Sequence, residues 1–104
     1  MEKEKPNNPL LNQTVQKAIK EGQLDILKQL VENNEDVMHV YIPVGTVLHL
    51  AAEYNQLAIV KWLLESGMDI DEESFPYKDT AIVSAAGKGH YEMVRYLYYN
   101  RGQR

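Results

Sequence analysis

The stretch Gly45-Thr-Val-Leu-His-Leu-Ala-Ala52, followed by Leu57-Ala-Ile-Val-Lys-Trp-Leu-Leu64, decides the fold. In each segment the apolar residues recur three and four positions apart, as the buried face of an amphipathic helix requires. The polar residues Tyr54-Asn55-Gln56 separate the two segments, and Asn55 can adopt the left-handed conformation that ends a helix. The two segments therefore predict a helical hairpin.

The same hairpin pattern recurs on both sides of this stretch. The corresponding blocks are Ala18–Val31, Ala51–Leu64 and Ala85–Tyr98, whose first residues are 33 and 34 positions apart. Each block opens on a small residue, and each has a basic residue at the same later position. Glu21-Gly22-Gln23 and Lys88-Gly89-His90 match the central polar break. Self-similarity at this period predicts a stack of three hairpins, in which each repeat buries its apolar faces against its neighbours.

Composition and charge narrow the class of function. The 104 residues, 44% of them hydrophobic, suit one domain spanning residues 1–104, with residues 1–9 as a flexible N-terminal segment. Eleven basic against fifteen acidic residues lack the electrostatic footprint of nucleic-acid binding, so we expect no nucleic-acid partner. The absence of cysteine fits a reducing compartment, and no apolar run is long enough to span a bilayer. We expect a cytoplasmic protein with no membrane partner.

On these residues the chain resembles the ankyrin repeat family, whose hallmark is a G-x-T-P-L-H-x-A-A opening and a later G-A-D-V-N. The middle unit, from Gly45 to Asp71, is a close match. The third unit keeps Asp79-Thr-Ala-Ile-Val-Ser-Ala-Ala86, with Val83 in place of the histidine, and the first is degenerate around Asn12-Gln13-Thr14. The resemblance implies an all-α fold, an alpha-solenoid of ankyrin-type helix-turn-helix repeats joined by short hairpin-like turns. The expected repeats are approximately 10–38, 39–71 and 72–104.

The opening of the middle unit has a physical rationale. Thr46 is placed to cap the first helix by accepting a backbone N–H, and His49 lies on the same turn and can hydrogen-bond back to it. The family usually has proline at the next position, where its fixed φ suits the first turn of a helix. Here Val47 and Ala81 occupy that position, so we expect a less rigid corner.

The remaining polar residues form no recognisable catalytic constellation. His39, His49 and His90 fall at three different places in the repeat. His49 could act as a ligand or a base, but the structural role at the corner is favoured. The serines have no elbow glycines around them, and there is no phosphate-binding loop. We therefore expect neither an enzyme nor a bound cofactor.

The acidic run Asp69-Ile-Asp-Glu-Glu73, with Asp79 nearby, has three interpretations. It can be a solvated surface, a calcium site or a patch that attracts a basic partner. Calcium loops need alternating ligands, a glycine turn and a final bidentate glutamate, and that pattern is missing. We expect no metal, and we keep a weak preference for a partner with a basic surface.

The ankyrin resemblance implies that another protein binds on the concave side, through the turn tips and the exposed positions of the first helices. Transferred position by position, this selects Tyr41, Ile42, Glu53, Tyr54, Phe75, Tyr77, Asp79 and Lys88. Aromatic residues at exposed tips suit an interface because such anchors dominate binding energy. The alternative is that Tyr41 or Phe75 packs against a neighbouring tip.

Trp62 and Tyr96 share one position on the second helices, and packing between repeats is favoured over an exposed stripe.

The two ends of the chain differ. The first unit is polar enough to cap the stack, whereas the last keeps an interior-like pattern that includes Ile82, Val83, Val94 and Tyr98. We therefore expect this end to meet further repeats, a second copy of the chain or a partner.

The expected function is a non-enzymatic protein-protein interaction module. The alternative is a small inhibitor or immunity-type protein that occludes a target enzyme, and tight binding over a large surface would distinguish it.

Overall fold

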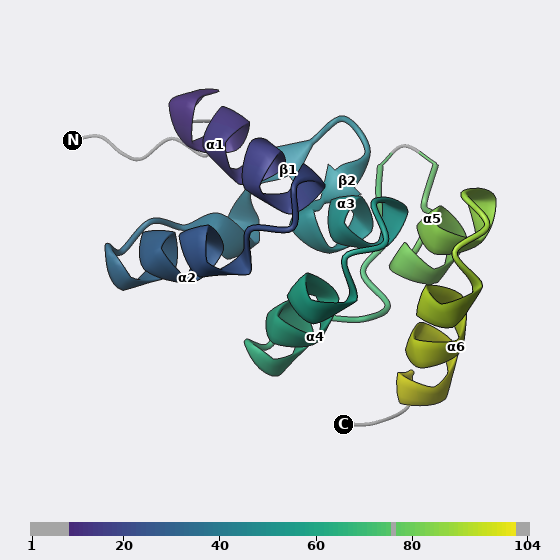
Figure 1. Cartoon of the computed structure of the whole chain (residues 1–104). Helices are drawn as coiled ribbons and strands as arrows, with labels where there is room; N and C mark the ends of the chain where they lie inside the picture. The colour runs from purple at the N-terminus through teal and green to yellow at the C-terminus, as the bar shows by residue number, and fades with distance from the viewer. Residues whose placement is uncertain (1–8, 76, 102–104) are drawn as a thin grey trace.

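Three helical hairpins stand in a row in the computed structural model, which describes residues 9–75 and 77–101 (Figure 1). The helices are α1 (Pro9–Lys20), α2 (Leu24–Glu32), α3 (Val47–Glu53), α4 (Leu57–Glu65), α5 (Ala81–Gly87) and α6 (Tyr91–Asn100). The first helices α1, α3 and α5 form one layer, and the second helices α2, α4 and α6 form the other. The predicted all-α solenoid is confirmed. The segment expected to be flexible, residues 1–9, lies outside the described residues except for Pro9, which begins α1.

The turns inside the hairpins have the predicted left-handed conformation. Gly22, Asn55 and Gly89 have φ values of 73°, 60° and 75°. Glycine reaches this region without steric cost, and asparagine tolerates it better than most residues. These residues end the first helices, so the chain reverses and each second helix packs back against its partner.

The connections between the repeats are the predicted hairpin-like turns. After the short helix η1 (Val37–His39), the strands β1 (Tyr41–Ile42) and β2 (Gly45–Thr46) pair in antiparallel register, with Tyr41 opposite Thr46. Among its described residues, the second connection contains no strand. There the Ser74 backbone N–H donates to the Asp79 carbonyl oxygen (2.8 Å), and the Asp79 N–H donates to Ser74 Oγ (3.1 Å). We call the β1–β2 hairpin (41–46) the second tip and the turn closed by Ser74 and Asp79 the third tip.

The centre of the core is α3, which packs against both α1 and α5. Each of its residues from Val47 to Ala52 is buried. Ala51 and Ala52 are fully inaccessible, and their small side chains let the neighbouring first helices approach closely. Trp62 and Tyr96 are partly buried and pack against the core, in agreement with the packing interpretation of that position.

The corner predicted from Thr46 and His49 is present and extends to the next repeat. Thr46 Oγ1 accepts hydrogen bonds from the backbone N–H groups of Leu48 (3.1 Å) and His49 (3.5 Å). The Thr46 N–H in turn donates to His49 Nδ1 (3.1 Å), which completes a capping box. Because the Asp79 carbonyl oxygen can only accept, His49 Nε2 carries a hydrogen and donates it across 2.6 Å. One buried imidazole therefore caps α3 and holds the third tip.

A second set of hydrogen bonds joins successive repeats near the interhelix turns. Gln56 Nε2 donates to the carbonyl oxygen of Lys20 (3.2 Å). His90 occupies the same position one repeat later, and its Nε2 donates to the carbonyl oxygen of Glu53 (2.7 Å). In each case the residue before a second helix satisfies a carbonyl at the end of the preceding repeat's first helix, where no intrahelical partner exists. The role of His90 is therefore structural.

Replacing His49 with alanine should destabilise the fold by about 3 kcal/mol, because the change leaves a cavity and removes the buried partners of Thr46 and Asp79. Urea unfolding followed by circular dichroism measures this loss. Val83→Ala is the matched control, since Val83 occupies the equivalent position in α5 but is 47% exposed. It should change stability by less than about 0.5 kcal/mol. Equal losses in the two variants would contradict the proposed role of the corner.

Candidate functional site

A groove runs between the two tips and the first helices α3 and α5, and we call it the tip groove. Its volume is about 410 Å³. It is lined by Pro43, Val44, Glu53, Ser74, Phe75, Tyr77, Asp79, Val83, Ser84, Gly87 and Lys88. Tip residues form one wall, and residues of α3 and α5, with Lys88 directly after α5, form the other. This is the side of the molecule on which the ankyrin resemblance implies partner binding.

Five of the eight residues predicted to bind a partner line this groove: Glu53, Phe75, Tyr77, Asp79 and Lys88. The side chains of Phe75 and Tyr77 are 73% and 81% exposed. Large apolar side chains that are this exposed favour binding to another protein, because their burial removes apolar surface from water. The structure thus gathers residues from two repeats around one hollow.

Two further apolar residues, Val44 and Val83, line the groove and were missed by position-by-position transfer. Val44 lies in the turn between β1 and β2, and Val83 replaces the histidine of the repeat opening. Both are exposed. The sequence could have indicated Val83, because an apolar residue stands there in place of the buried polar residue of the repeat pattern. Nothing indicated Val44, since hairpin turns accept many residue types.

Tyr41 lies beside the groove and links the second tip to the third. Its hydroxyl oxygen accepts a hydrogen bond from the backbone N–H of Phe75 (2.8 Å). The aromatic ring nevertheless remains 43% exposed. Tyr41 therefore both contacts the neighbouring tip and remains exposed to solvent, although the sequence alone leaves these as alternatives. The bond fixes the backbone that carries Phe75.

Two of the predicted residues lie elsewhere. Ile42 was expected at an exposed tip position, but it is only 5% exposed and belongs to the core. Successive side chains of a strand point to opposite faces, so β1 directs Tyr41 outward and Ile42 inward. Tyr54 is exposed but does not line the groove. Instead, the Lys20 ammonium lies 5.6 Å from the centre of its ring, over the junction between the first and second repeats.

The groove carries charges of both signs. Lys88 Nζ lies 3.6 Å from Glu53 Oε2, which joins the ends of α5 and α3. Because this ion pair is partly exposed, it contributes little to stability. Asp79 adds a second carboxylate, while its backbone is held by His49 and Ser74. The lining therefore combines apolar side chains with charged groups that can pair with both acidic and basic partners.

A further exposed apolar surface includes Val83 of α5, which also borders the tip groove, and Tyr98 of α6, and we call it the end face. Val83 (47% exposed) occupies the position of His49, which is fully buried beneath the third repeat. Tyr98 is exposed, whereas its counterpart Leu64 is half-buried. The Arg101 guanidinium lies 4.7 Å from the centre of the Tyr98 ring. Positions that the next repeat covers in the middle unit are thus open to solvent here.

The buried polar side chains among the described residues are Thr46, His49 and Ser74. All three take part in the hydrogen bonds of the corner or the third tip. His39 and His90 lie apart from them, on η1 and before α6. Within residues 9–75 and 77–101, no three His, Asp or Glu side chains gather as a metal site requires. No helix in that part of the chain is long and apolar enough to cross a membrane.

Comparisons with known proteins agree with the architecture. A family model for ankyrin repeats, in three copies, matches residues 13–104. Ankyrin repeat and SOCS box protein 11 of Homo sapiens is 30% identical over 83 residues, which are 80% of this chain and 25% of that protein. Ankyrin repeat and SAM domain-containing protein 6 of Mus musculus is 34% identical over 83 residues, covering 77% of this chain and 9% of that protein. The chain thus spans a quarter or less of these relatives.

Replacing Tyr41 with phenylalanine should release the third tip while leaving the core intact, because the change removes the acceptor for the Phe75 N–H and keeps the ring. Hydrogen exchange followed by NMR should show faster exchange of the Phe75 amide, with a global stability change of about 0.5 kcal/mol or less. Tyr77→Phe removes the same atom from an 81% exposed side chain and serves as the control. Unchanged exchange at Phe75 would show that the bond does not hold the tip.

Proposed function

The chain belongs to the ankyrin repeat family, and from that premise we propose that it is a non-enzymatic module that binds a partner protein at the tip groove. The observation that carries the proposal is the gathering of exposed Phe75 and Tyr77 with Val44 and Val83 around one hollow. Ankyrin repeats are a protein-protein interaction module, and this groove lies on the side formed by the tips and first helices.

The chemistry of the groove suggests the kind of surface it accepts. Its centre is apolar and aromatic, so an apolar side chain of the partner should occupy it. Glu53, Asp79 and Lys88 surround that centre with both signs of charge. A partner segment with an apolar anchor and flanking polar or charged residues fits this arrangement. With no cysteine in the chain, we place this interaction in the cytoplasm.

The test begins with capture of a binding protein from the source organism's lysate on the intact chain, followed by its purification. Biolayer interferometry then compares its affinity for the parent chain, Phe75→Ala and Tyr77→Ala. Each substitution should raise the Kd by about ten-fold or more, because it removes an aromatic anchor from the centre of the interface.

Tyr99→Ala provides the matched control, since Tyr99 is a 69% exposed tyrosine on α6 that does not line the groove. Circular dichroism checks that all variants are folded. If the Kd is unchanged in Phe75→Ala and Tyr77→Ala, the partner binds elsewhere and the tip groove is not its site.

We also propose that the end face contacts a second copy of the chain. In the middle unit the equivalent positions are covered by a repeat of this same chain, so another copy carries helices of the matching type. Tyr98 and Val83 supply exposed apolar area on that face.

Sedimentation equilibrium over a range of concentrations tests this contact. The parent chain should associate as its concentration rises, and Tyr98→Lys should remain monomeric because it places a charge in the contact. Tyr77→Lys, which changes the tip groove, should associate like the parent. A parent chain that stays monomeric throughout would contradict self-association.

A further inference from the structure

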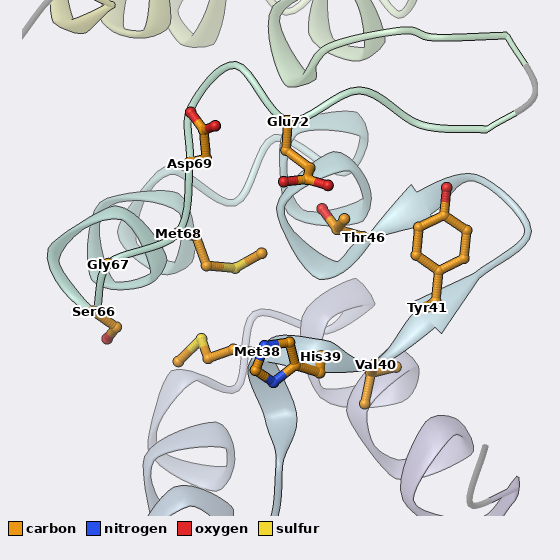
Figure 2. Close-up of a pocket in the computed structure, with 10 residues that line it drawn as sticks. All are labelled: Met38, His39, Val40, Tyr41, Thr46, Ser66, Gly67, Met68, Asp69 and Glu72. Atoms are coloured by element: carbon orange, nitrogen blue, oxygen red, sulfur yellow. The ribbon is translucent and has the colours of Figure 1, made fainter. Parts of the chain in front are cut away.

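A second hollow lies on the other side of the second tip, and we call it the methionine groove (Figure 2). Its volume is about 470 Å³, and it is lined by Met38, His39, Val40, Tyr41, Thr46, Ser66, Gly67, Met68, Asp69 and Glu72. One wall comes from η1 and β1, and the other from the turn that follows α4. The two grooves share no described residue, so this site is independent of the proposed function.

The apolar part of the groove consists mainly of two methionines. Figure 2 shows Met38 extending from η1 and Met68 from the opposite wall into the same space. Both side chains are partly buried and pack against the core. Methionine is unbranched, flexible and polarizable, so a surface built from it adapts to aliphatic side chains of different shapes. The groove is therefore suited to accept a large apolar side chain.

The polar part of the groove is acidic. The Glu72 carboxylate points into the hollow over Thr46, and Asp69 lies at its outer edge. Within residues 9–75 and 77–101, no ion pair engages either carboxylate. Across the groove His39 is hydrogen-bonded to Asp36 (2.8 Å). An apolar floor with uncompensated negative charge beside it favours a ligand that is apolar and cationic at once.

The acidic character extends beyond the groove along the chain. Between Lys28 and Lys78 the only lysine or arginine is Lys61, whereas nine acidic residues fall in that stretch. They are Glu32, Glu35, Asp36, Glu53, Glu65, Asp69, Asp71, Glu72 and Glu73. The remaining lysines and arginines lie before or after this stretch. Of these residues, Asp69 and Glu72 line the groove and Asp36 is hydrogen-bonded to its lining residue His39. Their negative charge attracts a segment with several positive charges.

We propose that the methionine groove binds a protein segment in which a large aliphatic side chain stands between lysine or arginine residues. The aliphatic side chain packs between Met38 and Met68, and the flanking cations pair with Glu72 and Asp69. Charge complementarity selects such a segment over an acidic or uncharged one. A small apolar molecule would leave the negative charge of Glu72 and Asp69 uncompensated.

NMR of the full chain with 13C-methyl methionine tests this proposal directly. The chain has four methionines, and Met93, fully buried in the core, serves as an internal reference. The probe is a short glycine-serine peptide with leucine between two arginines at its centre. Saturable shifts of the Met38 and Met68 methyl signals, with an unmoved Met93 signal, are expected.

Two matched peptides separate the contributions. Alanine in place of leucine should weaken binding by at least about five-fold if the apolar contact is real. Glutamates in place of the arginines should abolish the shifts, and about 1 M salt should weaken those of the original probe. If the alanine peptide binds as well as the leucine peptide, the region merely attracts cations and the proposal is wrong.

Two charge reversals in the protein complete the test. Glu72→Lys should weaken binding of the leucine peptide by about ten-fold or more. Glu92→Lys, the same change on α6 outside the acidic stretch, should alter it less than about two-fold. Equal effects of the two variants, or an absence of saturable methyl shifts in the parent chain, would overturn the proposal.

Discussion

The hydrogen bond from His49 Nε2 to the Asp79 carbonyl oxygen holds the second repeat to the third, and the shape of the tip groove depends on it. The same imidazole accepts the Thr46 N–H, so the start of α3 and the third tip share one buried side chain. With its backbone fixed there, Asp79 anchors the turn that carries Phe75 and Tyr77. The first helices and the tips consequently enclose a groove. Buried Ser74 packs beside Gly45, and the exposed bond between Tyr41 and Phe75 adds a further contact between the two tips.

The second tip separates two surfaces of different character. Its strand β1 alternates between an outward Tyr41 and an inward Ile42, so the tip is anchored in the core on one side and presents an aromatic ring on the other. On the side of α3 and α5, the surface is aromatic with mixed charge. On the side of η1 and the turn after α4, it combines thioether side chains with carboxylates. A single short hairpin thus separates two surfaces of different chemistry.

Much of the architecture was predictable because its signals are local in the sequence. The periodic apolar residues, the left-handed Gly22 and Asn55, and the Thr46–His49 corner each depend on residues a few positions apart. The prediction of an exposed Ile42 failed because alternation in a two-residue strand depends on register, which the repeat pattern does not specify. The bond from Phe75 to Tyr41 joins residues 34 positions apart. The convergence of Val44 and Val83 likewise depends on how the repeats stack, so sequence positions alone did not reveal it.

The first helices of the second and third repeats, α3 and α5, begin differently. This difference makes the local stability of the two repeats unequal. The Thr46 side chain caps α3, whereas Thr80 makes no side-chain cap bond at the start of α5. Val83 cannot supply the interactions that His49 makes. The third repeat should therefore fray before the middle one, because local opening begins where caps and buried contacts are fewest. Since that repeat supplies a wall of the tip groove, a bound protein would suppress the opening and raise the melting temperature.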